Sequence, residues 1–320
     1  MAKKKHKQEQ SVNQPINLSA TTYHVPVMLG ETIDALNIRK DGVYVDCTFG
    51  GGSHSREILK RLGDNGKLLA FDQDTDAAKN LPDDRRIIFL PHNFRHIKRF
   101  LRLHHIQQVD GILADLGVSS HQLNEATRGF SLRFEGSLDM RMDKRQSLTA
   151  FDVVNSYTEQ QLHKLFEQYG EVTNAKTLAK KIIQMRHAVS LQTITGFKHA
   201  IGDMVKGNPN RYFAQVFQAL RIEVNDELGA LKEMLLQAPD LLKPGGRVVV
   251  ITFHSLEDRI VKNFFKQGSF DEEKQDDPFG LNTKEKKFRI ITKKPIVPAN
   301  SEVEQNPRSR SAKLRVAEKI

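Results

Sequence analysis

A short glycine-rich segment follows the first strongly apolar stretch of the sequence. The apolar residues 43–48 include Asp46, and Gly50 to Gly52 follow directly, before a helical pattern that starts near Ser53. Glycines allow backbone conformations with positive φ and let a ligand approach the main chain closely. Such a turn between a strand and a helix is typical of nucleotide-type sites, although a triple glycine alone also fits an ordinary flexible turn.

Two carboxylates accompany this loop. Asp46 lies four residues before Gly50, and Asp72 ends the next predicted strand, where an acid can accept hydrogen bonds from a ribose diol. A dinucleotide motif would have a third glycine where Ser55 stands. The Asp-x-x-x-Gly-x-Gly pattern therefore favours S-adenosylmethionine, which has no pyrophosphate to bind at the helix end.

Alternating strands and helices must position these groups. Apolar runs predict strands at 43–48, 67–71, 86–90, 111–114, 247–253, 287–292 and 312–317. Helical patterns are expected at 53–62, 159–168, 174–187, 192–204, 211–237 and 257–266, with a turn at Lys243-Pro-Gly-Gly. The βα alternation predicts a parallel sheet with right-handed crossovers, and no strand is predicted at 124–207.

The expected organisation is thus one α/β domain with a helical insertion. The domain comprises residues 21–123 and 208–320, the inserted all-helical domain is 124–207, and residues 1–20 form a basic flexible tail. The last two predicted strands form a terminal antiparallel pair, as in class I methyltransferase sheets.

Composition and charge narrow the class of protein. The 320 residues are 38% hydrophobic, and no apolar run approaches the roughly 20 residues that cross a bilayer. Cys47 is the single cysteine, which excludes an internal disulfide and a cysteine-based zinc cluster and favours a reducing cytoplasm. The net charge of +10 comes from the two ends, +3 in residues 1–10 and +7 in residues 283–320, as expected for segments that meet a polyanion.

Several further segments share a pattern with a known family. They are residues 24–31, the glycine loop, 110–120, 128–131, 138–143, 217–228, 254–259 and 307–311. In this order they make the sequence resemble the RsmH (MraW) family of 16S ribosomal RNA cytidine N4-methyltransferases. The resemblance implies S-adenosylmethionine as cofactor, a Rossmann-like class I methyltransferase sheet with an inserted helical domain, and a cytidine in the decoding region of the small ribosomal subunit as target.

The resemblance also implies a set of site residues. It places the cofactor against the glycine loop, with Asp72 at the ribose and Phe94 offering a face for adenine stacking. Ser53 stands where the family usually has a second glycine. The expected cofactor-binding residues are Asp46, Gly50, Gly52, Ser53, His54, Asp72, Phe94, Asp115 and Gln122.

The exocyclic amine of cytosine is a poor nucleophile, because its lone pair is delocalised into the ring. Acceptor oxygens that bond its hydrogens would favour the transition state and could take the released proton. The candidates are Asp115, Asp139 and Asp143, and no metal is expected. The Asp/Asn-Pro-Pro-Tyr motif of many amino-methylating enzymes is absent after the fourth strand. Asp139 and Asp143 could instead belong to a salt-bridged lid.

Three more polar residues lie within the matching segments. The family match favours a functional role for Asn225 and Glu227, which could otherwise be exposed positions on a helix. His254, just beyond an apolar strand, is expected to be a hydrogen-bonded structural histidine more than a general base.

RNA binding would come from phosphate contacts, with the target base extruded into the pocket. The candidate contacts are Arg308, Arg310, Lys313 and Arg315, with Lys284, Lys286 and Lys287 as helpers. The expected partner is 16S rRNA within the small ribosomal subunit, without a membrane, and a homodimer is left open.

Two alternatives stay open on the sequence. A NAD(P)-dependent oxidoreductase would share the fold class, but Ser55 and the basic C-terminal strand pair argue against it. A non-catalytic RNA-binding or ribosome-assembly protein could retain a vestigial pocket; the intact loop with Asp72 and Asp115 argues against it, and only turnover excludes it.

Overall fold

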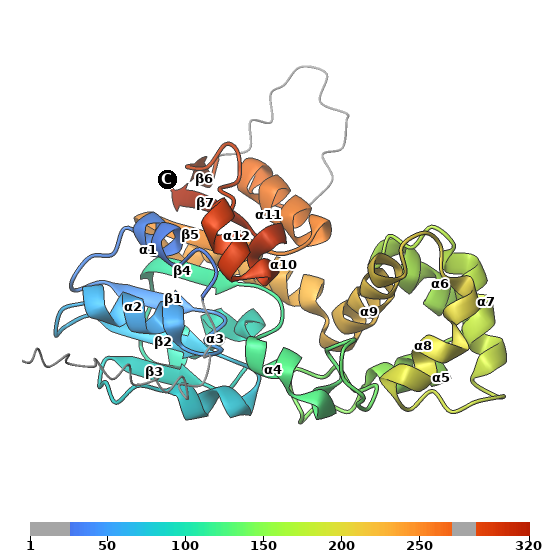
Figure 1. Cartoon of the computed structure of the whole chain (residues 1–320). Helices are drawn as coiled ribbons and strands as arrows, with labels where there is room; N and C mark the ends of the chain where they lie inside the picture. Colours follow the sequence, from blue (N-terminus) through green and yellow to red (C-terminus); the bar gives the residue numbers. More distant parts are fainter. Residues whose placement is uncertain (1–25, 271–285) are drawn as a thin grey trace, which may run out of the picture.

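Runs of branched and aromatic residues form one seven-stranded sheet. In this computed structural model, which describes residues 26–270 and 286–320, the strand order is β3-β2-β1-β4-β5-β7-β6 (Figure 1). The strands are β1 (Val43–Asp46), β2 (Lys67–Phe71), β3 (Ile87–Leu90), β4 (Val109–Asp115), β5 (Leu242–Thr252), β6 (Phe288–Ile290) and β7 (Lys313–Lys319). The predicted tail at 1–20 and Lys284 lie outside the described residues.

The pairing of the strands confirms the predicted fold class. Strands β1 to β5 pair in parallel, whereas β7 runs antiparallel to both β5 and β6. The chain moves outward from β1 to β3 and then returns to β4 on the other side of β1. In open α/β sheets, ligands bind beyond the carboxyl ends of the strands at such a reversal.

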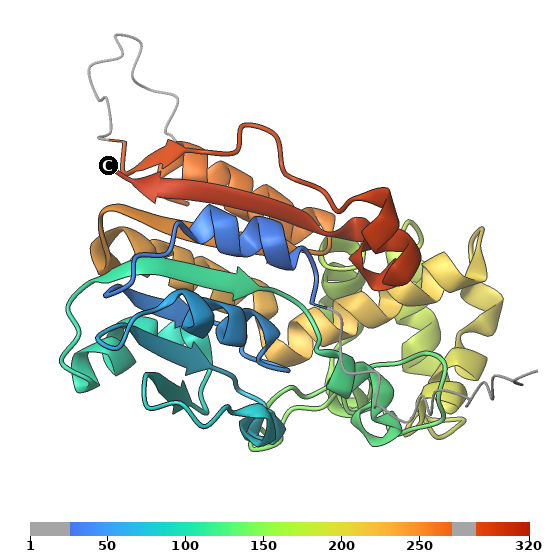
Figure 2. The same cartoon turned by 60° about the vertical axis from the view of Figure 1, so that its left-hand side comes forward.

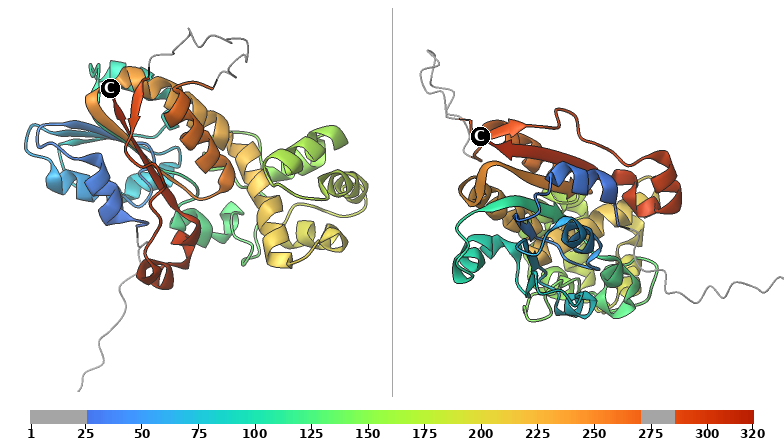
Figure 3. Two further views of the ribbon diagram at one scale, coloured as in Figure 1. Left: turned by 90° about the horizontal axis from the view of Figure 1, so that it is seen from above. Right: turned by 90° about the vertical axis from the view of Figure 1, so that its left-hand side faces the viewer.

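Helices cover both faces of the sheet because the strand residues alternate between two apolar clusters. Tyr44 and Leu68 belong to one cluster, and their neighbours Val45 and Leu69 belong to the other. The first face is covered by α1 (Leu29–Leu36) and α2 (Ser53–Arg61). The second is covered by α3 (Ile97–Leu103), α10 (Glu227–Leu241) and α11 (Ser255–Gln267), as Figure 2 and Figure 3 show.

A helical unit with its own core lies beside the sheet (Figure 1). Its helices are α5 (Ala150–Ser156), α6 (Glu159–Gln168), α7 (Ala175–Met185), α8 (Ile194–Ala200), η4 (Gly202–Met204) and α9 (Pro209–Asn225). Its core continues beyond the predicted boundary at residue 207, because Val216, Phe217 and Leu220 of α9 belong to it. The domain bounds stay a prediction, and we propose that the helical unit includes α9.

Short elements connect these two parts and extend the C-terminus. They are η1 (Thr75–Asn80), η2 (Phe94–His96), α4 (Ser120–Asn124), η3 (Ala126–Arg128), α12 (Asn300–Gln305) and η5 (Pro307–Ser311). Within the described residues, no helix has both the length and the apolar character needed to cross a membrane.

Two local predictions are wrong. The single helix expected at 211–237 is divided into α9 and α10, because Asp226 adopts a left-handed conformation with φ of 45°. The turn expected at Lys243-Pro-Gly-Gly lies inside β5. Gly245 has φ of 77° there, and the pairing of β5 with β4 changes register at this point. A glycine is suited to this irregularity, since other residues rarely adopt positive φ.

Candidate cofactor and substrate site

A cavity of about 350 Å³ lies at the carboxyl ends of the parallel strands. We call it the central cavity. Its wall comes from the glycine loop, the segments after β2 and β4, the start of α10 and the C-terminal segment 306–311. The predicted cofactor residues that line it are Gly50, Ser53, His54, Asp72, Phe94, Asp115 and Gln122. Its size falls in the range typical of small-molecule sites.

Asp46 and Gly52 shape the loop from outside the cavity lining. The buried carboxylate of Asp46 accepts hydrogen bonds from Ser55 Oγ at 2.6 Å and from the Thr48 backbone N–H at 3.0 Å. Burial raises the pKa of Asp46 in spite of these bonds. Gly52 has φ of 73°, and a Cβ there would lie 2.8 Å from the Phe49 ring. Both residues therefore fix the path of the loop.

Asp72 is held by two backbone groups at the edge of the cavity. Its Oδ2 accepts from the Gly50 N–H at 2.7 Å, and its Oδ1 accepts from the Asp74 N–H at 2.8 Å. Burial nevertheless raises the pKa of Asp72 to about 7. Two cavity neighbours that the sequence did not single out are linked here, since Asn93 Nδ2 donates to Gln73 Oε1 at 2.8 Å.

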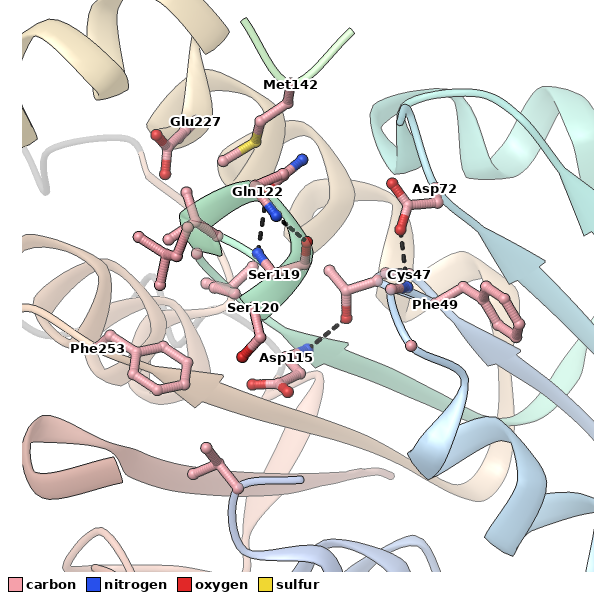
Figure 4. Close-up of a pocket in the computed structure, with 18 of the residues that line it drawn as sticks. Cys47, Phe49, Asp72, Asp115, Ser119, Ser120, Gln122, Met142, Glu227 and Phe253 are labelled. Atoms are coloured by element: carbon pink, nitrogen blue, oxygen red, sulfur yellow. Dashed lines mark hydrogen bonds between the residues drawn. The ribbon is translucent and has the colours of Figure 1, made fainter. Parts of the chain in front are cut away.

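Asp115 ends β4 at the cavity and has a buried carboxylate oxygen without a hydrogen-bond partner in the described residues. Its backbone N–H donates to Thr48 Oγ1 at 2.7 Å, which fixes the end of β4 against the glycine loop (Figure 4). Its Oδ2 lies 3.7 Å from His54 Nδ1, whereas its buried Oδ1 has no hydrogen-bond partner among residues 26–270 and 286–320. Burial, together with the charges of Asp46 and Glu257, raises the pKa of Asp115 well above its ordinary value. Buried polar atoms are normally paired, so Oδ1 suits a bound group.

Gln122 contributes to the wall and anchors the segment after β4. Its Oε1 accepts from the Ser119 N–H at 3.0 Å within a capping box of α4, and its Nε2 donates to Asp74 Oδ2 at 3.0 Å. Arg128 donates to the same Asp74 oxygen at 2.8 Å. Both side chains of this Asp74–Arg128 pair are buried.

The loop around Met142 forms the opposite wall of the cavity (Figure 4). Arg128 donates to the carbonyls of Arg141 and Met142 at 3.0 and 2.9 Å. From the other side, Asn225 Oδ1 accepts from the Met142 N–H at 2.7 Å, and Asn225 Nδ2 donates to the Met140 carbonyl at 2.8 Å. The buried Asn225, which also lines the cavity, thus holds the loop in place.

Asp139 and Asp143 lie outside the cavity lining. Each pairs with the arginine two residues later, Asp139 with Arg141 at 2.7 Å and Asp143 with Arg145 at 2.8 Å. Burial opposes their ionisation, but the arginine hydrogen bonds outweigh it, so the pKa of each aspartate lies below its ordinary value. Direct catalytic roles for these two residues stay predictions, and the geometry fits the salt-bridged alternative.

An ionic group of largely buried side chains also lines the cavity. Arg221 pairs with Glu227 at 2.8 Å, and both line the cavity together with Glu257. Glu257 lies 3.2 Å from His254 and accepts from the Phe253 N–H at 2.8 Å. Burial opposes ionisation of Glu257, but His254 and Arg221 lower its pKa overall.

All members of this group stand in family segments. Arg221 and Glu227 belong to 217–228, and His254 and Glu257 belong to 254–259, yet nothing in the spacing linked the two segments. His254 itself does not line the cavity.

The candidate RNA-binding residues fall into two groups. Arg308 lines the cavity and donates to Ser120 Oγ at 2.9 Å and to Asn124 Oδ1 at 3.1 Å, and Arg310 is exposed nearby. Arg315 is buried and pairs with Asp258 at 2.6 Å, and Lys313 lies 3.3 Å from the same carboxylate. Arg308 and Arg310 thus form no ion pair with the described residues, whereas Lys313 and Arg315 are engaged with Asp258.

Comparison with known proteins agrees with the resemblance. Residues 21–320 match the MraW methylase family. A protein of Bacteroides thetaiotaomicron named ribosomal RNA small subunit methyltransferase H is 55% identical over 93% of this chain and 98% of its own length. A protein of the same name from Parabacteroides distasonis is 54% identical, with the same coverage of both chains. A solved rRNA methylase of Streptococcus thermophilus aligns with 11% identity and a TM-score of 0.39 over 91% of this chain and 95% of that one.

Within the described part of the chain, no group of three or more histidine, cysteine or acidic side chains is placed to hold a metal ion. The sequence matches, together with the order of the sheet and the cavity at its carboxyl edge, show that the chain belongs to the MraW methylase family.

Proposed function

We propose that this protein transfers a methyl group from S-adenosylmethionine to the exocyclic N4 of a cytidine in the decoding region of 16S rRNA. The observation that carries the proposal is the central cavity, where the glycine loop, Asp72 and Asp115 converge at the reversal point of a methyltransferase-type sheet. The names of the relatives support rRNA of the small subunit as the substrate class. Ribosomal RNA as substrate also favours the cytoplasm as the place of action.

The cavity residues fit the cofactor. Gly50 and Gly51 bring the main chain to the cavity wall, the positive φ of Gly52 fixes the turn that follows, and Asp72 presents a carboxylate beside the cavity. Phe94 offers an apolar face for adenine. The buried, unpaired Asp115 Oδ1 needs a polar partner of the kind that the cofactor's amino group or the acceptor amine supplies.

The bound cofactor would supply an electrophilic methyl group on its sulfonium. The protein's contribution is to bring the acceptor nitrogen into line with that methyl group, since positioning supplies much of the rate in such a transfer. The wall formed by Met142 and Asn225 would orient the acceptor base. We assign Asp115 the role of hydrogen-bonding the amine of the cytosine or the cofactor. Asp139 and Asp143 are weaker candidates for this role, because each is paired with an arginine outside the cavity.

The test uses S-adenosylmethionine with a labelled methyl group, the purified full chain and small ribosomal subunits that lack this modification. Large subunits serve as the control. Label that appears as N4-methylcytidine only in small-subunit RNA supports the proposal. Cofactor binding without transfer to any RNA would refute the substrate assignment and leave the fold and the cofactor site standing.

A further inference from the structure

A strongly basic segment follows the outer edge of the sheet. Residues 286–301 contain Lys286, Lys287, Arg289, Lys293 and Lys294 and no aspartate or glutamate. All five side chains belong to exposed residues. We call this segment, which includes the edge strand β6, the basic edge.

Most of the positive charge of the basic edge is not paired with carboxylates of residues 26–270 and 286–320. Arg289 pairs with Glu318, but the four lysines have no ion-pair partner among the described residues. Two carboxylates of the neighbouring elements β7 and α11 are already engaged. Glu318 also pairs with Arg247, and Asp258 pairs with Lys313 and Arg315. A row of cations without counter-charges is the usual footprint of a polyanion site.

The basic edge leads to the central cavity. Its residues 288–290 pair with 317–319 at the far end of β7, and Ile296 pairs with Leu314 at the near end. The chain then passes through α12 to η5, where Arg308 lines the cavity and Arg310 is exposed. Figure 2 shows this path along one border of the molecule, toward α12. At the rise of a strand, β7 spans about 20 Å, enough for several nucleotides.

Apolar side chains on the same segment are compatible with another partner. Ile290, Ile291, Ile296 and Val297 are 38%, 40%, 38% and 59% exposed. A surface built for a protein partner would normally be depleted in lysine, whereas lysines without carboxylates favour phosphate groups. The positive charge of the segment therefore favours a nucleic acid over a protein as its partner.

We infer that the basic edge binds the sugar-phosphate backbone of the RNA that flanks the nucleotide held in the central cavity. This inference rests on the proposed function and adds the direction in which the flanking strand leaves the site. The contacts are electrostatic and independent of base sequence, so they affect affinity and its salt dependence and leave the methyl-transfer step unchanged.

The test is the double variant Lys293→Gln/Lys294→Gln. The matched control is Lys40→Gln/Lys67→Gln, which removes two exposed lysines without ion pairs at the other end of strands β1 and β2. Association with protein-free 16S rRNA is measured between 50 and 200 mM salt. We expect the slope of log affinity against log salt to fall by about 1 per lysine removed in the edge variant and to stay unchanged in the control. The KM for small subunits should rise, while kcat and the affinity for S-adenosylhomocysteine stay at the wild-type values.

Each outcome has a separate meaning. If the wild type methylates small subunits and the edge variant keeps the wild-type salt slope, the basic edge does not bind RNA and only this inference fails. If the edge variant differs from the control on assembled subunits but not on protein-free RNA, the partner is a ribosomal protein and the RNA assignment is overturned. If the wild type methylates no RNA, the proposed function fails and this inference fails with it.

Discussion

At the scale of single residues, we expect Asp72 to link cofactor binding to pH. Burial raises the pKa of this carboxyl to about 7, although two backbone N–H groups already bond it. Ribose hydroxyls donate best to the ionised form, whose fraction falls as the pH drops through 7. We therefore expect the affinity for S-adenosylhomocysteine to weaken below pH 7, by up to about tenfold per pH unit. Isothermal titration calorimetry from pH 6 to 8 measures this.

The Asp72→Asn variant is the control for that pH profile. It removes the charged acceptor, so affinity should fall at pH 8 by about 1.5–3 kcal/mol, the usual contribution of hydrogen bonds to a charged group. The pH dependence should disappear as well. A variant that kept the wild-type pH slope would assign the titration to another group.

Asp115 is the aspartate that we expect to matter for methyl transfer. Asp115→Asn keeps the size of the side chain but changes the hydrogen-bonding groups at the buried, unpaired oxygen. Single-turnover transfer at saturating cofactor should fall about 100-fold, the scale of general acid–base or electrostatic contributions. Asp143→Asn is the matched control and should stay within a few-fold of the wild type. Equal losses in both variants would contradict the assignment.

Many of the residues that line the central cavity could be predicted from the sequence, whereas the direction in which each side chain points could not. Asp46 was predicted to bind the cofactor, and the structure places it beneath the loop, bonded to Ser55 and Thr48. Spacing shows that an acid is near a turn, yet it does not show which side of the turn its carboxylate faces. The same reason hid the approach of Arg221 to Glu257, which depends on the tertiary fold.

At the scale of elements, the Asp74–Arg128 pair connects the N-terminus of η1 to η3. Both side chains are about 95% buried, and Arg128 also donates to the carbonyls of Arg141 and Met142. Arg128→Met should destabilise the protein by about 3–5 kcal/mol, because it leaves a buried carboxylate unpaired. Chemical denaturation measures this loss.

The control for the Arg128 variant comes from the same loop. Arg145→Met breaks a pair whose arginine is 48% exposed, so its cost should stay within about 1 kcal/mol. Adding Asp74→Asn to Arg128→Met should recover part of the stability, because the unpaired charge is then removed. If Arg128→Met and Arg145→Met lower the free energy of unfolding by the same amount, burial does not determine how much an ion pair of this protein contributes to stability.

The elements themselves were largely predictable, since apolar periodicity marked every strand of the sheet. The boundary between α9 and α10 was not, because neither Gly nor Pro occurs there. The break depends on Asp226, a residue type that tolerates the left-handed region, and its carboxylate is held 2.5 Å from Arg95 on a different element. A contact between residues so distant in sequence leaves no local pattern.

At the scale of the whole molecule, the central cavity joins parts that are far apart in the chain. The glycine loop, the Met142 loop, the start of α10 and segment 306–311 all contribute to its wall. The alternation of strands and helices predicted the fold class. It did not predict that the C-terminal segment 306–311 would form part of the cavity wall. Arg308 reaches α4 through Ser120 and Asn124, a contact that only the assembled chain creates.

Cofactor binding should therefore protect separate segments together. We expect S-adenosylhomocysteine to slow amide hydrogen exchange in residues 50–54, 140–142 and 306–311 at once, while helices α6 and α7, which lie outside the cavity wall, keep their rates. At 100 times the dissociation constant, binding stabilises the folded state by about 2.7 kcal/mol, enough for a clear change in exchange. Hydrogen-exchange mass spectrometry of the full chain measures each segment. Protection confined to residues 50–54 would mean that the cofactor contacts the sheet domain alone, and that the Met142 loop and the C-terminal segment close only when RNA is bound.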